Sequence, residues 1–253
     1  MHGAAQLIGD QLFVTNRDAD SEETGLSQVV ERYSLSEGAF SFEQRYETLC
    51  PSLHGSDANE DYLVFGCSDG VLSIDLNDEN YAATKLSNPE SLAEGKRIST
   101  VITHFERSEL IGIASGQLFI INPANEIAIT ELELPENAGS RVLQGMDAHG
   151  ERLYVITDDG DLHVYDAENS WELIDSLENV VSTSESGVSV LTTVSAAEEI
   201  LFVFDKNEQE LILIDIDGVS VLGHADINLD ISSMVWLGLA DHDEDHDHDH
   251  NHD

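Results

Sequence analysis

The sequence predicts an all-β protein, and within that class a β-propeller of four-stranded blades. Short segments rich in Val, Ile, Leu and Tyr alternate with polar positions along the 253 residues, and DG, GD, GQ and NE turns separate them. No long amphipathic helix is evident. One strand type recurs as QLFVTN, YLVFGC, LIGIAS, LYVITD and LFVFDK, starting at residues 11, 62, 110, 153 and 201. Repeats of this period with four strands each are typical of propeller blades.

The four strands of each blade follow in a fixed order. The innermost strand comes first, and we expect it to line the central channel, at 2–8, 53–59, 97–105, 141–148 and 187–194. The recurring strand comes second, at 11–16, 62–67, 110–115, 153–158 and 201–206. The third strands lie at 29–35, 71–76, 117–122, 161–166 and 210–216. More polar outer strands follow at 42–48, 81–87, 127–134 and 171–178.

The strand count gives five complete blades and one further inner strand, ISSMVWLGLA at 231–240. An orphan inner strand normally closes the ring against outer strands supplied by the N-terminus. Because this chain begins on an inner strand, we expect the propeller, residues 1–240, to be incomplete at its N-terminus. A five-bladed ring with a loose sixth strand is the alternative.

The last thirteen residues, 241–253, read DHDEDHDHDHNHD. Neutral imidazole suits zinc, copper and nickel, and interleaved carboxylates add hard ligands, so a flexible strand of this kind can form several four-ligand sets. Such a segment cannot bury a core, and we expect it to be disordered without metal. The expected ligands are His242, His246, His248, His250 and His252. A solvated acidic tail and an engineered purification tag are the alternative interpretations.

The charge balance excludes some partners. The chain has 51 acidic and 10 basic residues, for a formal net charge of −41. Phosphate binding needs a basic stripe, and none is present, so nucleic acid is not an expected partner. Anionic membrane surfaces are disfavoured for the same reason. Acidic surfaces also occur on proteins in salty surroundings, and here the field would concentrate divalent cations.

Compartment signals are few. No apolar run of eighteen residues occurs, so we expect no membrane insertion, and no basic, apolar-cored signal peptide begins the chain. Two cysteines, Cys50 and Cys67, flank a predicted strand. If joined, they would close a loop worth about 3 kcal/mol and place the protein outside the cytosol. Two buried free thiols are the alternative, and spacing alone does not decide between them.

The segment ETLCPSLHGSDANEDYLVFGCSDGVLSIDL, with C-P-x-L-H-G at 50–55 and F-G-C-x-D-G-V-L at 65–72, resembles the AztD family of periplasmic zinc metallochaperones. The opening HGAAQLIGDQLFVTNRD resembles the His-Gly strand of the preceding blade in that family. The later blades match mainly in pattern. Family members are longer at the N-terminus, where they hold further blades and histidine-rich segments, so ligands located there cannot be carried over to this chain.

The resemblance implies a monomeric periplasmic propeller that carries Zn²⁺ and delivers it to the solute-binding protein of a zinc ABC transporter. It also implies that Cys50 and Cys67, which match the family's cysteine pair, form a disulfide. The histidine-rich segment of this chain lies at the opposite end from the one expected in the family. Its role as a zinc collector is therefore a hypothesis drawn from its own residues.

Two histidines suggest a site in the folded body. His2 and His54 each precede a glycine and stand ten and nine residues before the aligned Leu12 and Leu63. Equivalent positions on adjacent inner strands would point to one level of the channel. There the two imidazoles could share a zinc ion with Asp57. A hydrogen-bonded imidazole in a His-Gly turn is the structural alternative.

The remaining histidines are weaker candidates. His104 ends an inner strand near a channel mouth and is retained as a possible ligand. His149 lies in a turn, His163 alternates with apolar residues in a strand, and His224 lies in an outer strand, so none of the three is assigned a function.

We expect a carrier and not an enzyme. Propellers do host metal-dependent hydrolases such as lactonases, but their sites need carboxylate or amide ligands on inner strands, and the inner strands here contain almost no glutamate. The G-x-S-x-G elbow of serine hydrolases is also absent from the sequence. A lactonase-like hydrolase and a protein-interaction propeller with a metal-buffering tail are the alternative functions.

Overall fold

The computed structural model describes residues 3–17 and 25–238. In this part of the chain all regular structure is β, arranged as five four-stranded sheets in which each strand pairs with the next along the chain. Each sheet is an antiparallel meander, as expected for a propeller blade. The prediction of an all-β propeller with five complete blades is confirmed.

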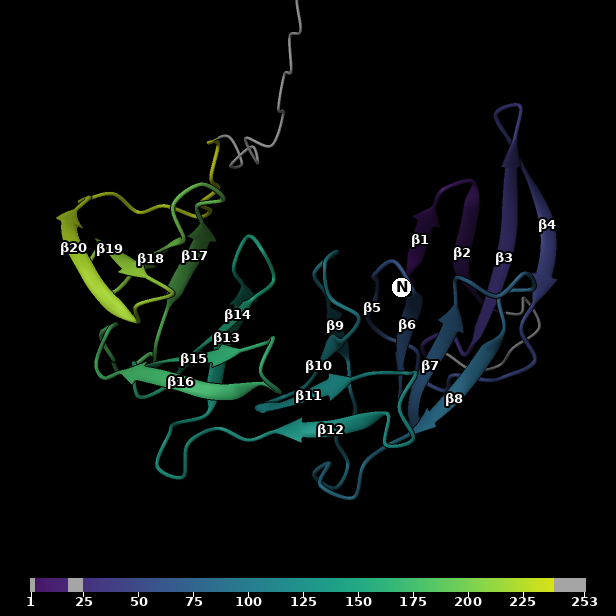
Figure 1. Ribbon diagram of the computed structural model, residues 1–253, viewed down its shortest axis with the longest axis horizontal. Coiled ribbons are helices and arrows are strands. Elements are labelled where there is room, and N and C mark those ends of the chain that lie inside the picture. Colours follow the sequence, from purple (N-terminus) through teal and green to yellow (C-terminus); the bar gives the residue numbers. More distant parts are fainter. Residues whose placement is uncertain (1–2, 18–24, 239–253) are drawn as a thin grey trace, which may run out of the picture. The chain divides into compact units, whose positions relative to one another are not determined.

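The chain divides into two compact units, Met1–Arg141 and Val142–Asp253. The first unit contains three blades (Figure 1). Blade 1 comprises β1 (Ala5–Ile8), β2 (Gln11–Asn16), β3 (Val29–Ser36) and β4 (Ala39–Arg45). Blade 2 comprises β5 (Ser56–Ala58), β6 (Tyr62–Cys67), β7 (Gly70–Asp75) and β8 (Ala83–Ser87). Blade 3 comprises β9 (Thr100–Ile102), β10 (Leu110–Ala114), β11 (Gln117–Ile121) and β12 (Ile129–Leu132).

The second unit contains two blades, with Arg141 of β13 as the point of division. Blade 4 comprises β13 (Arg141–Met146), β14 (Arg152–Thr157), β15 (Leu162–Asp166) and β16 (Glu172–Leu177). Blade 5 comprises β17 (Val190–Val194), β18 (Ile200–Asp205), β19 (Glu210–Asp215) and β20 (Ser220–Asp226). The described residues include no helix long and apolar enough to cross a membrane.

The cores lie between consecutive blades of a unit. Phe13 and Val30 of blade 1 pack against Leu63 and Ile74 of blade 2, and all four side chains are fully buried. The second and third strands of blade 2 are buried on both faces, which explains why YLVFGC and GVLSID read as nearly continuous apolar runs. The same arrangement joins blades 2 and 3, and blades 4 and 5.

The prediction of a sixth inner strand is wrong for the part of 231–240 that the structure describes. Residues 231–238 form no strand. Trp236 instead lies against blade 5, where its ring stacks on Phe202 at 5.7 Å and its backbone N–H donates to Thr193 Oγ1 at 3.0 Å. A strand requires a neighbour that pairs with its backbone, and no described strand pairs with this segment.

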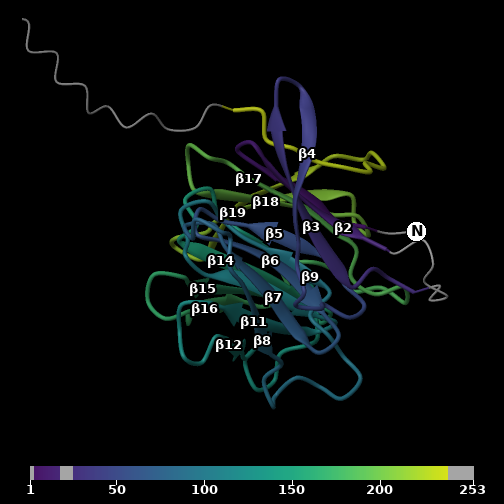
Figure 2. The same cartoon turned by 90° about the vertical axis from the view of Figure 1, so that its right-hand side faces the viewer.

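One hairpin is longer than its counterparts. β3 and β4 have eight and seven residues, and both views show their hairpin extending beyond the ends of β1 and β2 (Figures 1 and 2). Its turn contains Glu37 and Gly38, which have φ angles of 51° and 78°. Two consecutive residues with positive φ are characteristic of a type I′ turn, whose twist matches that of the flanking strands.

Candidate metal site

Three of the predicted ligands lie in the described part of the chain: His54, Asp57 and His104. His2 and the five tail histidines, His242, His246, His248, His250 and His252, lie outside the described residues. Within residues 3–17 and 25–238, no group of three or more His, Cys, Asp or Glu side chains converges as a metal site would require.

His54 precedes β5 and joins blade 2 to blade 3. Its Nδ1 lies 2.7 Å from the carbonyl oxygen of Ser99, so Nδ1–H is the donor in the neutral ring. That tautomer has its lone pair on Nε2. Metal-binding histidines are commonly oriented in this way, by a hydrogen bond from one ring nitrogen to a backbone carbonyl. The geometry therefore fits a ligand, and it fits equally a structural link between inner strands.

The position after His54 requires a glycine for two reasons, its positive φ and its close contact with a neighbouring backbone. Gly55 has a φ of 73°, and a Cβ at this position would lie 2.4 Å from the Ser99 carbonyl oxygen. A Cβ at Gly66, across the sheet, would lie 2.2 Å from the Ile98 carbonyl oxygen. The His-Gly pair thus brings the inner strands of blades 2 and 3 into backbone contact, which supports its interpretation as a structural device.

Asp57 accepts two backbone hydrogen bonds. Its Oδ1 accepts from Ala58 N at 2.9 Å, and its Oδ2 accepts from Thr103 N in the next blade at 3.0 Å. Burial raises the pKa of the Asp57 carboxyl, while the two backbone N–H groups act in the opposite direction. Only Oδ2 therefore links blade 2 to blade 3, whereas Oδ1 binds within β5, and the sequence offered no signal of this arrangement.

His104 lies in the loop after β9. Its ring packs on Phe105 with ring centres 4.5 Å apart, and its Nδ1 accepts a hydrogen bond from the backbone N–H of Glu106 at 3.3 Å. In the neutral ring this contact places the proton on Nε2. That tautomer is not the one found for His54, and it makes His104 a less suitable ligand in this conformation.

The equivalence of His2 and His54 is not supported by the strand register. Ala5 pairs with Val14 in blade 1, and Ser56 pairs with Phe65 in blade 2. Because Leu12 and Leu63 are aligned, Ser56 corresponds to Ala5, and His54 corresponds to Gly3. The spacings of ten and nine residues differ by one, and one residue reverses the face on which a strand's side chain lies. His2 itself lies outside the described residues, so its place beside His54 stays a prediction that the register does not support.

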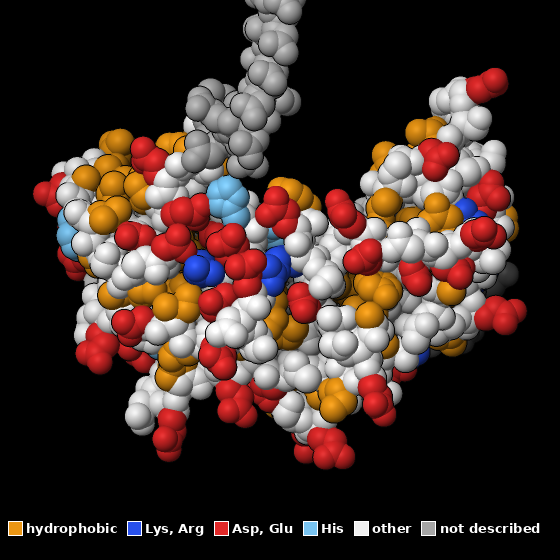
Figure 3. Space-filling view, viewed as in Figure 1, with side chains coloured by type: hydrophobic (Ala, Val, Ile, Leu, Met, Phe, Trp, Pro, Cys, Tyr) orange, Lys and Arg blue, Asp and Glu red, His pale blue; other side chains and the backbone are white. Residues whose placement is uncertain are grey.

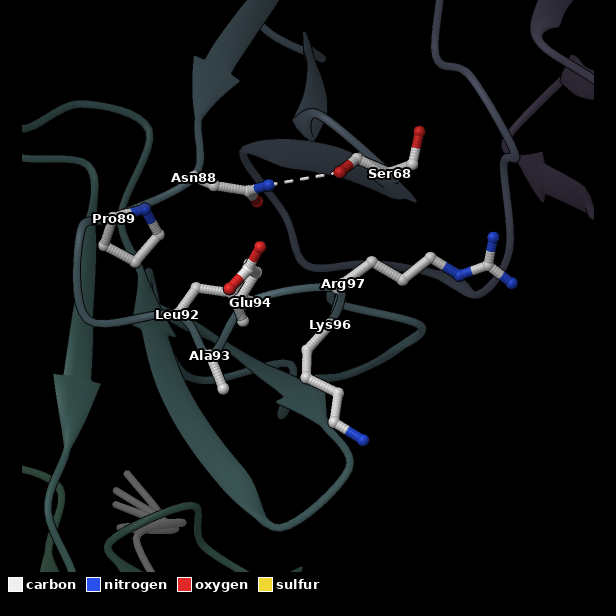
Figure 4. Close-up of a pocket in the computed structure, with 9 residues that line it drawn as sticks. Ser68, Asn88, Pro89, Leu92, Ala93, Glu94, Lys96 and Arg97 are labelled. Carbon is white, nitrogen blue, oxygen red and sulfur yellow. Dashed lines mark hydrogen bonds between the residues drawn. The ribbon is translucent and has the colours of Figure 1, made fainter.

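Two of the concave regions in the described part of the first unit bear on the predicted metal site. One, of about 400 Å³, is lined by Gly3 to Gln6 of the first inner segment and by Leu53 to Ser56 of the second, so it includes His54. The other, of about 510 Å³, is formed by the loop between β8 and β9 (Figure 4). There Asn88 donates to the Ser68 carbonyl, and the side chains of Lys96 and Arg97 extend in different directions. The second region has no histidine and carries two cations. A third concave region, of about 540 Å³, also has no histidine. Of these three regions, only the first contains a predicted ligand and is a candidate metal site.

The second unit contains a charged group that the sequence did not reveal. His149 Nε2 lies 2.9 Å from Glu199 Oε1, which joins a turn of blade 4 to a turn of blade 5. Burial raises the pKa of Glu199, His149 lowers it, and Asp147, Asp217 and Glu151 raise it further. Arg152 lies in the same region and pairs with Asp166 and Asp217. These turns are far apart in sequence, so only the fold brings them together.

His163 and His224 have structural contacts. His163 is buried between Ser176 and Thr157, and His224 pairs with Glu210 on the outer hairpin of blade 5 at 3.3 Å. Acidic side chains are spread over the whole face seen in Figure 3, and basic ones are few. No cluster of basic side chains stands out on that face.

The predicted disulfide is confirmed. Cys50 and Cys67 are bonded, with their Cα atoms 4.9 Å apart, and both residues are fully buried in the core between blades 1 and 2. The bond ties the segment before β5 to the end of β6. A disulfide of this kind is consistent with an oxidising compartment outside the cytosol.

Comparison with known proteins shows similarity at the level of fold. No family model matches the sequence. Two structures of AztD from Citrobacter koseri, one described as apo, superpose with TM-scores of 0.74 and 0.75 at 21% identity, over 92% of this chain. The chain spans only 62% and 61% of those two proteins. Hsv2 from Kluyveromyces lactis is more distant, with a TM-score of 0.56 and 9% identity over 84% of this chain and 61% of that protein. The chain therefore has a β-propeller fold like that of AztD.

Proposed function

We propose that this chain is a zinc carrier that works in the periplasm and passes Zn²⁺ to the solute-binding protein of a zinc ABC transporter, without catalysing a reaction. The AztD-like propeller, which covers 92% of the chain, is the observation that carries the proposal. The Cys50–Cys67 disulfide supports the compartment. The histidine- and aspartate-rich segment 241–253 supports the cargo, because its five imidazoles alternate with carboxylates.

In this mechanism the chain has two zinc-binding sites of different affinity. The segment 241–253 collects Zn²⁺ through ligands that exchange rapidly. The cavity beside His54 holds the ion more tightly, with His54 Nε2 as one ligand and His2, outside the described residues, as a second candidate. Docking to the solute-binding protein then replaces these ligands one at a time. Binding should weaken between about pH 7 and pH 5, because a protonated imidazole cannot bind a metal ion.

The proposal is tested by titrating Zn²⁺ into four forms of the protein in the presence of a chromophoric chelator. The forms are the whole chain, the chain without 241–253, the whole chain with His54→Gln, and the combination. Removal of the tail should abolish the weak, multiple binding. His54→Gln should lower the affinity of a remaining single ion at least tenfold, because the loss of even a residue that only orients a metal ligand costs about tenfold to a hundredfold. A tail with its five histidines replaced by asparagine keeps the negative charge and is the matched control.

The outcomes separate the two sites and the function. If tail removal abolishes all binding, the cavity site is wrong and the tail alone is the zinc ligand. If the asparagine tail binds as well as the natural one, the histidines are not ligands. If none of the forms binds Zn²⁺ better than another protein of equal charge, the carrier proposal fails.

Transfer and catalysis need their own assays. The zinc-loaded chain should supply the metal-free solute-binding protein of a zinc transporter even when a chelator scavenges free zinc, because the ion passes within a complex. If the chelator abolishes the transfer, zinc reaches the solute-binding protein only after it dissociates from this chain. Hydrolysis of lactones or esters that depends on one tightly held metal ion would instead indicate an enzyme.

A further inference from the structure

One face of blade 1 is apolar and exposed. Paired residues of an antiparallel sheet share a face, and one cross-strand row of blade 1 reads Leu7, Leu12, Tyr33, Phe42. The next row on the same face contributes Leu35 and Phe40. We call these six residues the distal face of blade 1. Leu7, Phe40 and Phe42 keep 57%, 51% and 58% of their surface exposed.

The opposite face of the same sheet is a normal blade interface. Phe13 and Val30 alternate with distal-face residues along β2 and β3, and both are completely buried against blade 2. None of the distal-face residues belongs to a core described for this unit. Blade 1 therefore has apolar side chains on both faces of its sheet, but within its unit another blade packs against only one of these faces.

The repeat shows what covers such a face. The row of blade 2 that corresponds to the distal row is Ala58, Leu63, Ile74, Ala83. Leu63 and Ile74 are 0% exposed because they pack against blade 1. Blade 3 presents Leu110 and Ile121 to blade 2 in the same manner, and blade 5 presents Leu201 and Ile214 to blade 4. In each pair the covering group is a four-stranded sheet with branched apolar side chains.

The edge of the distal face is polar, and its buried carboxylate, Glu31, already has hydrogen-bond partners within blade 1. Glu31 is buried at one end of the face, where it accepts hydrogen bonds from Asn16 at 2.6 Å, Tyr33 at 2.8 Å and Arg45 at 3.1 Å. Tyr33 and Phe42 meet edge to face with ring centres 5.6 Å apart. The side chains are therefore ordered in place before any partner arrives, as is usual for a preformed packing surface.

We propose that the distal face is the docking surface for another blade of the same propeller, formed by polypeptide outside these 253 residues. The match to AztD supports this source, because almost two fifths of each AztD chain has no counterpart here. A second copy of this chain is a poor occupant, since two bodies with a net charge of −41 repel each other. The proposal concerns packing alone and does not rest on zinc binding.

Thiol labelling tests the proposal, because the natural cysteines are joined and buried. Phe42→Cys, and separately Leu7→Cys, are introduced into the 253-residue chain and into the product of the complete reading frame that contains it. We expect labelling at least tenfold slower in the longer product at both positions. Ile127→Cys, at a side chain 72% exposed on blade 3, is the control and should react equally in both.

Three results would overturn the proposal. The first is a reading frame that encodes nothing beyond these residues. The second is equal labelling of Phe42→Cys and Leu7→Cys in the two proteins. The third is protection in the 253-residue chain that increases with protein concentration, together with a dimer in analytical ultracentrifugation, since this would make a second copy the occupant.

Discussion

At the scale of single residues, the pair His54 and Gly55 shows how a motif can look functional and still have a structural task. His54 donates to the Ser99 carbonyl, and Gly55 lets the same backbone approach without a clash. Metal binding would use the other ring nitrogen of His54, so the two interpretations are compatible. For the stability of the fold, Gly55 is the more important residue of the pair, because a side chain at its position would clash with the Ser99 backbone.

Gly55→Ala should destabilise the protein strongly. The new Cβ would lie 2.4 Å from a backbone oxygen, at a φ of 73° that disfavours any side chain. Gly38→Ala is a matched control, because its φ is 78° and its Cβ would meet no atom within 4 Å. We expect Gly38→Ala to cost about 1 kcal/mol, because a Cβ in the left-handed region lies too close to the following carbonyl oxygen. Gly55→Ala should cost about 1 to 3 kcal/mol more, because overpacking adds to the backbone strain. Equal losses in urea denaturation would show that the close contact relaxes freely.

A second residue-level prediction concerns His163, which is 3% exposed. The Thr157 hydroxyl donates to Asp159 at 2.6 Å, so it can only accept from His163 Nε2, and Nδ1 then accepts from Ser176 at 2.8 Å. Burial lowers the pKa of His163, although Asp161 and Asp159 oppose the shift. The folded state therefore holds a proton less readily than the unfolded state, whose histidine titrates near about 6.5.

The sign of the pH dependence follows from that difference. His163 contributes its full stability above pH ~6.5, and this contribution is lost as the pH falls through its lower folded-state pKa. Urea denaturation of the natural protein and of His163→Gln, measured from pH 8 to pH 5, isolates this residue from the other histidines. The natural protein should lose more stability on acidification than the variant. Parallel curves would mean that His163 is protonated as readily in the folded state as in the unfolded chain.

At the scale of elements, blade 2 is stabilised both by burial of its strands and by a disulfide. Its second and third strands are almost entirely buried, and Cys50–Cys67 closes a loop of seventeen positions around its inner strand. The inner strand itself, β5, has only three residues, and within the blade it pairs with β6 alone. The disulfide and the backbone contacts of Gly55 and Asp57 hold it in place.

Removal of the disulfide should therefore cost about 3 kcal/mol, by the loop-entropy estimate. The measurement compares guanidinium denaturation of the natural protein with that of the double variant Cys50→Ala, Cys67→Ala. The natural protein with a reductant present gives an independent reading of the same loss, without a cavity. A loss below about 1 kcal/mol in both experiments would indicate that β5 is held by its neighbours and not by the covalent bond.

The sequence predicted the buried strands well and the inner strands poorly. The segment 62–67 coincides with β6, because a short, nearly continuous apolar run between two turns is typical of a strand that is buried on both faces. The inner strand expected at 97–105 reduces to β9, Thr100–Ile102, because beyond Ile102 the Thr103 N–H donates to the Asp57 side chain and a turn follows at His104. The register does not support the alignment of His2 with His54, because a difference of one residue in spacing cannot be interpreted until the strand pairing is known. The sequence predicts Asp57 as a ligand, but one of its two hydrogen bonds comes from a backbone N–H forty-six residues away, which the sequence alone does not reveal.

At the scale of the whole molecule, charge is the dominant property. The chain has 51 acidic residues against 10 basic ones, and several of the basic side chains are already paired with carboxylates, as Arg45 is with Glu31 and Lys85 with Asp69. Most carboxylates therefore face others of the same sign. Self-repulsion of this kind keeps a protein soluble but lowers the stability of its compact state. The same field raises the local concentration of divalent cations, which is compatible with the proposed binding of Zn²⁺.

Added salt should consequently stabilise the protein. Between 0.01 M and 1 M NaCl the Debye length falls from about 30 Å to about 3 Å, so repulsion between distant carboxylates is screened. We expect the urea midpoint at pH 7 to rise across this range, most steeply below about 0.1 M. Urea is the suitable denaturant because it carries no charge. At pH 4, near the ordinary pKa of Asp and Glu, much of the charge is neutralised and the rise should shrink. A rise of equal size at both pH values would instead mean that salt acts through the hydrophobic effect, and a falling midpoint at pH 7 would mean that attractive ion pairs outweigh the net charge.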